Sequence, residues 1–184
     1  MAATNSTMLP LGTKASDFSL RDTISDKIIS LSDLKSDIAT VIMFICNHCP
    51  YVIHIQSEVV NVAKKYQAKG ISFVAISSND LESYPADGPE NMKLFAEKYG
   101  FTYPYLYDET QEVAKAYHAA CTPDFYIFDR NLACIYHGRF DDATPKSGQV
   151  VTGKELSAAL DNVLAGKPGK TNQHPSIGCS IKWK

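Results

Sequence analysis

The stretch IATVIMFICNHCPYV, residues 38–52, decides the fold. Residues 38–45 form a nearly continuous apolar run, which is typical of a central strand covered on both faces. Pro50 suits the first turn of a helix, where the missing N–H of proline costs nothing. Cys46 and Cys49 therefore lie at a strand-to-helix junction. The unpaired N–H groups and the dipole of a helix N-terminus stabilise thiolate there, and thiolate is the form that attacks disulfides and peroxides.

Strands and helices alternate along the rest of the chain. After Pro50, and again after Pro89, apolar residues recur at the spacing of a helix that buries one face. A capping box from Thr152 to Glu155 marks the start of the last helix. This order predicts an α/β fold with a mixed central sheet flanked by helices. The expected strands are 17–20, 27–31, 39–45, 71–76, 125–128 and 133–136, and the expected helices are 50–69, 89–99, 110–117 and 152–165, with a polar loop at 77–88.

Length, charge and cysteine content narrow the class of protein. The chain has 184 residues and a net charge of −2, which fits a single domain with a core at about 11–165 and a tail at 167–184. A net charge this close to zero gives the protein no electrostatic attraction to nucleic acid. No segment has the roughly 18 uninterrupted apolar residues that a membrane helix requires. Residues 1–13 lack the pattern of a secretory signal, and an odd number of cysteines suggests reduced thiols. We therefore expect a cytoplasmic protein of unassigned oligomeric state.

Four short motifs resemble a known family. They are an opening segment at 12–20, the block FICNHCPYV at 44–52, the residues TPDF at 122–125, and the ending GCSIKW at 178–183. Over about 11–165 the chain resembles thioredoxin-fold proteins of the peroxiredoxin-like branch, related to the alkyl hydroperoxide reductase/thiol-specific antioxidant group. The resemblance implies a thioredoxin-like fold and a cis Thr122-Pro123 bond, in a loop that lies against both cysteines. It also implies that substrate contacts Asn47, His48, Thr122 and Pro123.

The sequence departs from true peroxiredoxins at the positions that activate peroxide. With Cys49 taken as the peroxidatic cysteine, the family's proline and Thr/Ser fall on Ile42 and Cys46, and its arginine falls near Pro123. These departures imply slow peroxide reduction and favour a dithiol–disulfide pair. The main expectation is a thiol–disulfide oxidoreductase that acts on protein or small-molecule thiols and disulfides and needs no cofactor.

The roles of the pair follow from the likeness to thioredoxins, in which the first cysteine attacks. Cys46 is thus expected to form a mixed disulfide with substrate, and Cys49 to resolve it. His48 lies between them, where an imidazolium would favour thiolate and make the pair more oxidising; the alternative is a solvated loop residue. The strand at 38–45 contains no acid, so proton transfer must use His48, water or a residue distant in the sequence.

Other functions stay open at this point. A thiol peroxidase would use Cys49 to attack hydroperoxides and Cys46 to resolve the product. A metal-delivery module, for copper for example, would use the two cysteines with His54, His118 or His137. The cysteines can also be purely structural thiols. The favoured function needs no resident metal.

The remaining cysteines and the tail complete the expectations. Cys134 lies in a strand pattern and Cys121 precedes the expected cis bond, and both are expected to fill the core. Cys179 is either an unreactive tail thiol or a third redox thiol that recharges the pair. A free tail has little reason to carry large apolar residues. We therefore expect residues 177–183 to pack back onto the domain by burying Ile177, Ile181 and Trp183.

Overall fold

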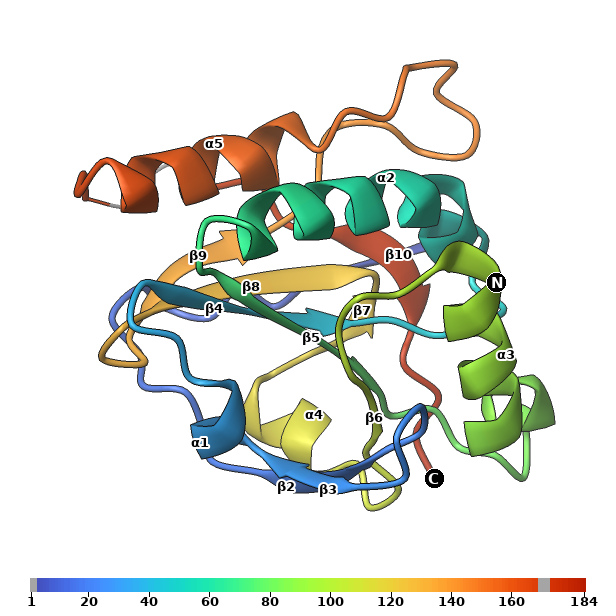
Figure 1. Ribbon diagram of the computed structural model, residues 1–184. Coiled ribbons are helices and arrows are strands. Elements are labelled where there is room, and N and C mark those ends of the chain that lie inside the picture. The colour runs from blue at the N-terminus through green and yellow to red at the C-terminus, as the bar shows by residue number, and fades with distance from the viewer. Residues whose placement is uncertain (1–2, 169–172) are drawn as a thin grey trace.

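A seven-stranded mixed sheet forms the centre of the computed structural model, which describes residues 3–168 and 173–184 (Figure 1). Central strand β4 pairs in parallel with β5 and antiparallel with β8, so the predicted mixed sheet is confirmed. The strand order is β3 (Ile28–Ser30), β2 (Ser19–Asp22), β6 (Tyr105–Tyr107), β5 (Ser72–Ser77), β4 (Ala39–Phe44), β8 (Asp124–Asp129) and β9 (Cys134–Gly138).

Helices cover both faces of this sheet (Figure 1). Because side chains alternate along a strand, Val41 and Met43 of β4 join the core under one set of helices, and Ile42 and Phe44 join the core on the opposite face. All six residues of β4 are buried, as expected of a central strand. The first face carries α2 (Pro50–Gln67), α3 (Pro89–Tyr99) and α5 (Lys154–Leu164), and the second carries α1 (Leu31–Leu34) and α4 (Glu112–Ala116).

Several short elements are absent from the sequence-based expectations. An element of two to four residues shows no measurable periodicity, so tertiary contacts and not local pattern define it. The longer helices begin and end close to the expected residues. The unpredicted elements are β1 (Ala3–Asn5), α1, the 3-10 helix η1 (Pro85–Asp87), β6, β7 (Cys121–Thr122) and β10 (Ile177–Ser180).

The capping box predicted at Thr152 to Glu155 is wrong. The residue that caps α5 is Gly153, in the left-handed region at φ 60°, and no side chain caps the helix. Instead, Oδ2 of Asp141 accepts the backbone N–H groups of Thr152 and Gly153, each at 2.7 Å. Glu155 turns away to form an ion pair with Arg139 at 2.7 Å. The N–H groups of Glu155 and Leu156 in the first turn of α5 donate to the backbone carbonyl of Phe140, each at 3.2 Å, so a main-chain acceptor replaces the expected side-chain cap.

A second, three-stranded sheet joins the two ends of the described chain. Tail strand β10 lies between β1 and β7, antiparallel to both. The tail therefore packs on the domain, but its burial differs from the expectation. Ile181 is buried, whereas Trp183 is 43% exposed and Ile177 is 37% exposed. Part of the tail, residues 169–172, lies outside the described residues. No helix in the described ranges is long and apolar enough to cross a membrane.

Candidate active site

The Cys46–Cys49 segment joins the end of β4 to the start of α2. The helix begins at Pro50, as predicted, so Cys49 is its N-cap residue. Cys46 and Cys49 are 1% and 0% exposed. The peptide bond between Thr122 and Pro123 is cis, and this loop lies beside the cysteines: Oγ1 of Thr122 is 3.3 Å from the Cys46 sulfur, and its carbonyl oxygen is 3.3 Å from the Cys49 sulfur.

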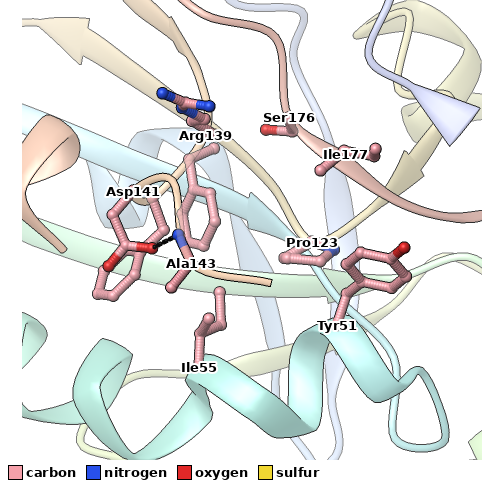
Figure 2. A pocket seen from close by; sticks show the side chains of 10 residues that line it. Tyr51, Ile55, Pro123, Arg139, Asp141, Ala143, Ser176 and Ile177 are labelled. Atoms are coloured by element: carbon pink, nitrogen blue, oxygen red, sulfur yellow. Dashed lines mark hydrogen bonds between the residues drawn. The ribbon is translucent and has the colours of Figure 1, made fainter. Parts of the chain in front are cut away.

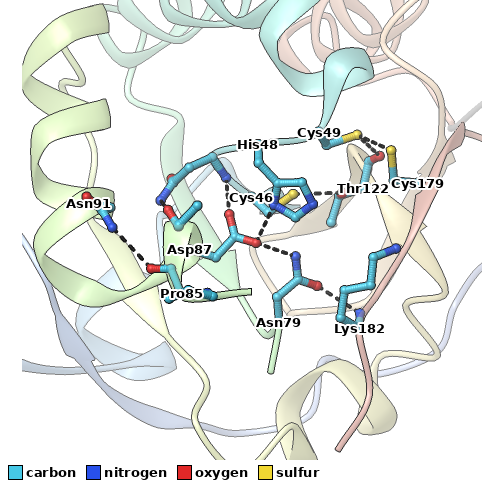
Figure 3. A network of polar contacts seen from close by, with 12 residues as sticks. Cys46, His48, Cys49, Asn79, Pro85, Asp87, Asn91, Thr122, Cys179 and Lys182 are labelled. Carbon is cyan, nitrogen blue, oxygen red and sulfur yellow. Dashed lines mark hydrogen bonds and ion pairs between the residues drawn. The ribbon is translucent and has the colours of Figure 1, made fainter. Parts of the chain in front are cut away.

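Three cysteines meet at this point (Figure 3). The sulfur of Cys49 lies 2.9 Å from the sulfur of Cys179, and the sulfurs of Cys46 and Cys49 both contact Thr122. Cys46, Cys49 and Cys179 therefore form a buried cluster of three thiols. The sequence predicted the first two as neighbours and left the place of Cys179 open.

The surroundings of Cys49 favour thiolate on that residue. Its pKa is lowered to about 5, mainly because the Cys46 thiol donates a hydrogen bond to its sulfur, with further donation from the thiol of Cys179 and from the N–H groups of Val52 and Cys179. Burial opposes this effect, but the four donors outweigh it. The N–H of Val52 belongs to the first turn of α2, where helix N–H groups lack internal partners.

The two neighbours of Cys49 have the opposite shift. The pKa of Cys46 is raised well above its usual value by its hydrogen bond to Cys49, by burial and by the charge of Asp87. Burial, and then the hydrogen bond to Cys49, raise the pKa of Cys179 to about 12. The electrostatics thus favour Cys49 as the attacking thiolate. This is the reverse of the order expected from the likeness to thioredoxins, in which Cys46 attacks and Cys49 resolves.

A buried carboxylate, Asp87, holds the loop between the two cysteines (Figure 3). Its Oδ1 accepts the backbone N–H of Asn47 at 2.8 Å, and its Oδ2 lies 2.6 Å from Nδ1 of His48 and accepts Nδ2 of Asn79 at 2.8 Å. Asp87 is 0% exposed. It is the acid that the strand at 38–45 lacks, supplied by the segment expected to be a polar loop. No local pattern marks it, because Asn47 and His48, the residues that it positions, lie about 40 positions away in the sequence.

His48 is held in place and is not a freely solvated loop residue. Its ring stacks on Tyr84, with centroids 5.1 Å apart, and its Nε2 is buried without a hydrogen-bond partner among the described residues. Asn47 also has internal partners: its side chain donates to the carbonyl of Ala86 and accepts from the hydroxyl of Tyr105, both at 3.0 Å. Asn47 therefore shapes the loop, and its side-chain amide is engaged before any substrate binds.

A small cavity adjoins Pro123 (Figure 2). Its volume is about 20 Å³, enough for one or two waters. Tyr51 and Ile55 of α2 form one side, and Ser176 and Ile177 of the tail form the side across Pro123. Movement of the tail would therefore enlarge this cavity next to the cis-proline loop.

The other cysteines lie in the core, as expected. Cys121 and Cys134 are buried, and burial raises the pKa of each thiol. Cys134 belongs to the core on the α1 and α4 face, on the far side of the sheet from α2.

The histidines proposed for a metal site do not gather around the cysteines. His54 and His118 are exposed, and both ring nitrogens of His137 are engaged, by Asp124 and by the N–H of Leu9. Within the described ranges, one group of three metal-binding side chains is found: Cys46, His48 and Asp87, whose ligand atoms lie within 4.8 Å of one another. A metal function would have to use that group.

Two solved structures are similar to almost the whole chain. A crystal structure of an uncharacterized conserved protein from Geobacillus kaustophilus is 61% identical, with a TM-score of 0.98 over 100% of this chain and 97% of that chain. A hypothetical protein from Sinorhizobium meliloti 1021 is 45% identical, with a TM-score of 0.95 over 98% of each chain. No curated protein matches the chain.

More distant likenesses identify the fold. The thioredoxin domain of a thiol-disulfide oxidoreductase from Bacteroides vulgatus is 14% identical, with a TM-score of 0.63 over 82% of this chain and 98% of that chain. This likeness confirms the predicted thioredoxin-like fold. The sequence profile of the AhpC/TSA family matches residues 11–136, a stretch that contains Cys46, Cys49 and the cis-proline loop. This match supports a thiol redox role, and the chain belongs to the AhpC/TSA family.

Proposed function

We propose that the protein is a thiol–disulfide oxidoreductase whose Cys46 and Cys49 alternate between a dithiol and a disulfide. The observation that carries the proposal is the environment of the Cys49 sulfur. It sits at the N-cap of α2, where hydrogen bonds lower its pKa to about 5, and one of those bonds comes from the Cys46 thiol. A thiolate in contact with a second thiol is the arrangement that disulfide exchange requires. Five free cysteines fit a reducing compartment, so we assign the protein to the cytoplasm.

In the proposed reaction, the Cys49 thiolate attacks one sulfur of a substrate disulfide. A bond forms between Cys49 and that sulfur, the substrate S–S bond breaks, and the other substrate sulfur leaves as a thiolate. Cys46 then attacks the Cys49 sulfur, and its proton passes to the departing substrate thiolate. The substrate is reduced by two electrons and the pair is oxidised to a disulfide. Two thiols of a reducing partner return the pair to the dithiol by the reverse exchange: the first forms a mixed disulfide with the pair, and the second displaces the protein sulfur, so that the partner leaves as a disulfide.

Residues around the pair support these steps. The N–H groups of Val52 and Cys179 stabilise negative charge on Cys49 before the attack. We propose that Thr122, Pro123 and His48 contact the substrate, since they line the cluster, and that Asn47 positions the loop. Cys49 is 0% exposed, so substrate reaches it only when part of its cover moves.

A thiol peroxidase is the second candidate, and the thiolate on Cys49 favours it. In that reaction, Cys49 attacks a hydroperoxide, forms a sulfenic acid and releases hydroxide or alkoxide. Cys46 then displaces water to give the same disulfide. The hydroxyl of Thr122 lies 3.3 Å from the sulfur of Cys46, not from that of the attacking Cys49. We therefore rank the peroxidase below the disulfide exchanger.

Stopped-flow oxidation of the reduced protein separates these functions. We expect a small aliphatic disulfide to remove two thiols per chain and to react faster than hydrogen peroxide does. A reaction markedly faster with peroxide would instead assign the peroxidase. Metal analysis of freshly purified protein, with thiol counts before and after reductant, tests the metal-delivery function; bound metal at one ion per chain would favour it.

The pH dependence of the first step provides a further prediction. A thiol with a lowered pKa stays ionised above that pKa, so the attack rate on a small disulfide should be nearly level from neutral pH down to about 5. Below it, the rate should fall about tenfold per pH unit, because only thiolate attacks. Single-turnover rates measured across pH test this. A decline that begins near the usual cysteine pKa of about 8.5 would contradict the assignment of thiolate to Cys49.

A further inference from the structure

We propose that Cys179 is a third redox thiol of this site, which exchanges a disulfide with Cys49. The inference rests on the proposed function and extends it to the tail. The sulfurs of Cys49 and Cys179 are 2.9 Å apart, and Cys179 is 4% exposed (Figure 3). A disulfide bond is about 2.0 Å long, so an approach of roughly 1 Å would join them.

The position of Cys179 is built by its strand. In the antiparallel register of β10 and β7, Cys179 lies opposite Thr122, the residue before the cis bond. On its other side, Cys179 lies opposite Ala3 of β1. The tail strand thus pairs with the backbone of the cis-proline loop on one edge and is fixed by β1 on the other. This pairing presents the Cys179 side chain to Cys49.

The neighbouring glycine allows this close approach. A Cβ atom added to Gly178 would lie 1.9 Å from the carbonyl oxygen of Thr122, so any other residue would force the strand away from the loop. Cys179 therefore reaches Cys49 because a glycine precedes it. Gly178, which has no side chain, lies against the backbone of Thr122, and the next residue, Cys179, lies against the sulfur of Cys49.

The segment after Cys179 is anchored to the same network that holds the Cys46–Cys49 loop. The backbone N–H of Lys182 donates to Oδ1 of Asn79 at 2.9 Å, and Nδ2 of the same Asn79 donates to Asp87. The carbonyl of Lys182 accepts the N–H of Asp80 at 2.8 Å and Nε2 of Gln111 at 2.7 Å. Asn79 thus connects the tail to the carboxylate that positions His48 and Asn47. The three thiols are held together by one set of buried polar contacts.

The exchange conserves atoms and electrons. Starting from the Cys46–Cys49 disulfide, Cys179 gives up its proton and attacks the Cys49 sulfur. The Cys49–Cys179 bond forms, the Cys46–Cys49 bond breaks, and Cys46 leaves as a thiolate that takes up the proton. The oxidation state of the protein is unchanged. Cys179 can also attack a Cys49–substrate mixed disulfide, in which case the substrate leaves as a thiol and the protein retains the disulfide.

The result of this exchange is a disulfide that involves the tail. The Cys49–Cys179 disulfide would fix β10 over the site, while the Cys46–Cys49 disulfide leaves the tail free to separate. Since β10 also forms one side of the cavity beside Pro123, its release would expose both Cys49 and that cavity. Transfer of the disulfide to Cys179 would therefore close the site to a second substrate.

Disulfide mapping in cysteine variants tests the inference. Reduced protein is oxidised with a small aliphatic disulfide, quenched with acid and an alkylating agent, and its peptides are mapped by mass spectrometry. In Cys46→Ser we expect an intramolecular Cys49–Cys179 disulfide. In Cys179→Ser we expect the Cys46–Cys49 disulfide. A persistent adduct of the oxidant on Cys49 in Cys46→Ser, with Cys179 still a free thiol, would overturn the inference and leave the proposed function intact.

Failure of the proposed function gives a different result. In that case neither the unmodified protein nor Cys179→Ser would form the Cys46–Cys49 disulfide.

Gly178→Ala, combined with Cys46→Ser, keeps Cys49 and Cys179 but displaces the strand. It should slow formation of the Cys49–Cys179 disulfide at least tenfold. Gly148→Ala, also combined with Cys46→Ser, is the control: a Cβ at Gly148 meets nothing within 4 Å, its φ of +67° strains alanine only within an exposed loop, and the rate should be unchanged. Equal rates in the two glycine variants would contradict the role of the strand.

Discussion

Replacement of Cys49 by serine should abolish disulfide reductase activity, with a loss of roughly 10³-fold or more, because it removes the nucleophile. Cys46→Ser should retain the first step, since the Cys49 thiolate remains. Its pKa should rise toward the ordinary value, because the hydrogen bond from the Cys46 thiol is the largest cause of the shift. Single-turnover kinetics with a small disulfide, together with thiolate absorbance in the ultraviolet, measure both effects.

A buried cysteine outside the cluster provides the control for this experiment. Cys134 lies in the core on the far side of the sheet, so Cys134→Ala should leave the rate of the first step unchanged. The opposite order of roles gives a distinct result. If Cys46→Ser is inactive and Cys49→Ser accumulates a mixed disulfide on Cys46, then Cys46 is the nucleophile, as the likeness to thioredoxins predicts.

Asp87→Asn should lower both the stability of the protein and the pKa of Cys46. The carboxylate of Asp87 accepts hydrogen bonds from the backbone N–H of Asn47 and the side-chain amide of Asn79, and it contacts the ring of His48. An amide offers a single acceptor oxygen, so at least one buried donor loses its partner, at a cost of about 1–3 kcal/mol. At about 2–4 °C per kcal/mol, the Tm should fall by about 2–12 °C. The pKa of Cys46 should also fall, because the charge of Asp87 helps to raise it.

An exposed aspartate is the matched control for Asp87. Asp26 pairs with Arg21 at 2.7 Å on the surface, with both side chains more than half exposed. Asp26→Asn should change the stability by less than about 1 kcal/mol. Thermal unfolding of the reduced proteins compares the two variants. An equal and small Tm change in both would mean that Asp87 does not organise the site.

The junction between β4 and α2 could be predicted because its signals are local. An uninterrupted apolar run marks the central strand, and Pro50 marks the first residue of the helix. The same proline also bears on which of the two thiols is the better candidate for the nucleophile. If the helix begins at Pro50, then Cys49 is the N-cap and lies closest to the unpaired N–H groups. The analogy with thioredoxins favoured Cys46 in spite of this local signal.

The position of Asp87 could not be predicted, and for Cys179 the sequence left two alternatives open, because both positions depend on contacts between distant segments. Asp87 meets residues about 40 positions away in the sequence, and nothing in its own segment distinguishes it from other polar loop residues. Cys179 meets Cys49 across 130 positions, through a four-residue strand that has no periodicity of its own. Only the register with β7 and the absence of a side chain at Gly178 bring the two sulfurs together. Tertiary packing, and not local pattern, completes the cluster.

The small sheet of β1, β10 and β7 has a practical consequence for how this protein is handled. It pairs Ala3, at the start of the described chain, with Cys179 of the tail. A purification tag at either end would be attached within a few residues of this sheet and would hinder the movement of β10. Rates measured on such fusions would then reflect the tag as much as the enzyme. An affinity sequence inserted in the exposed segment at 145–150, away from both ends, avoids this problem.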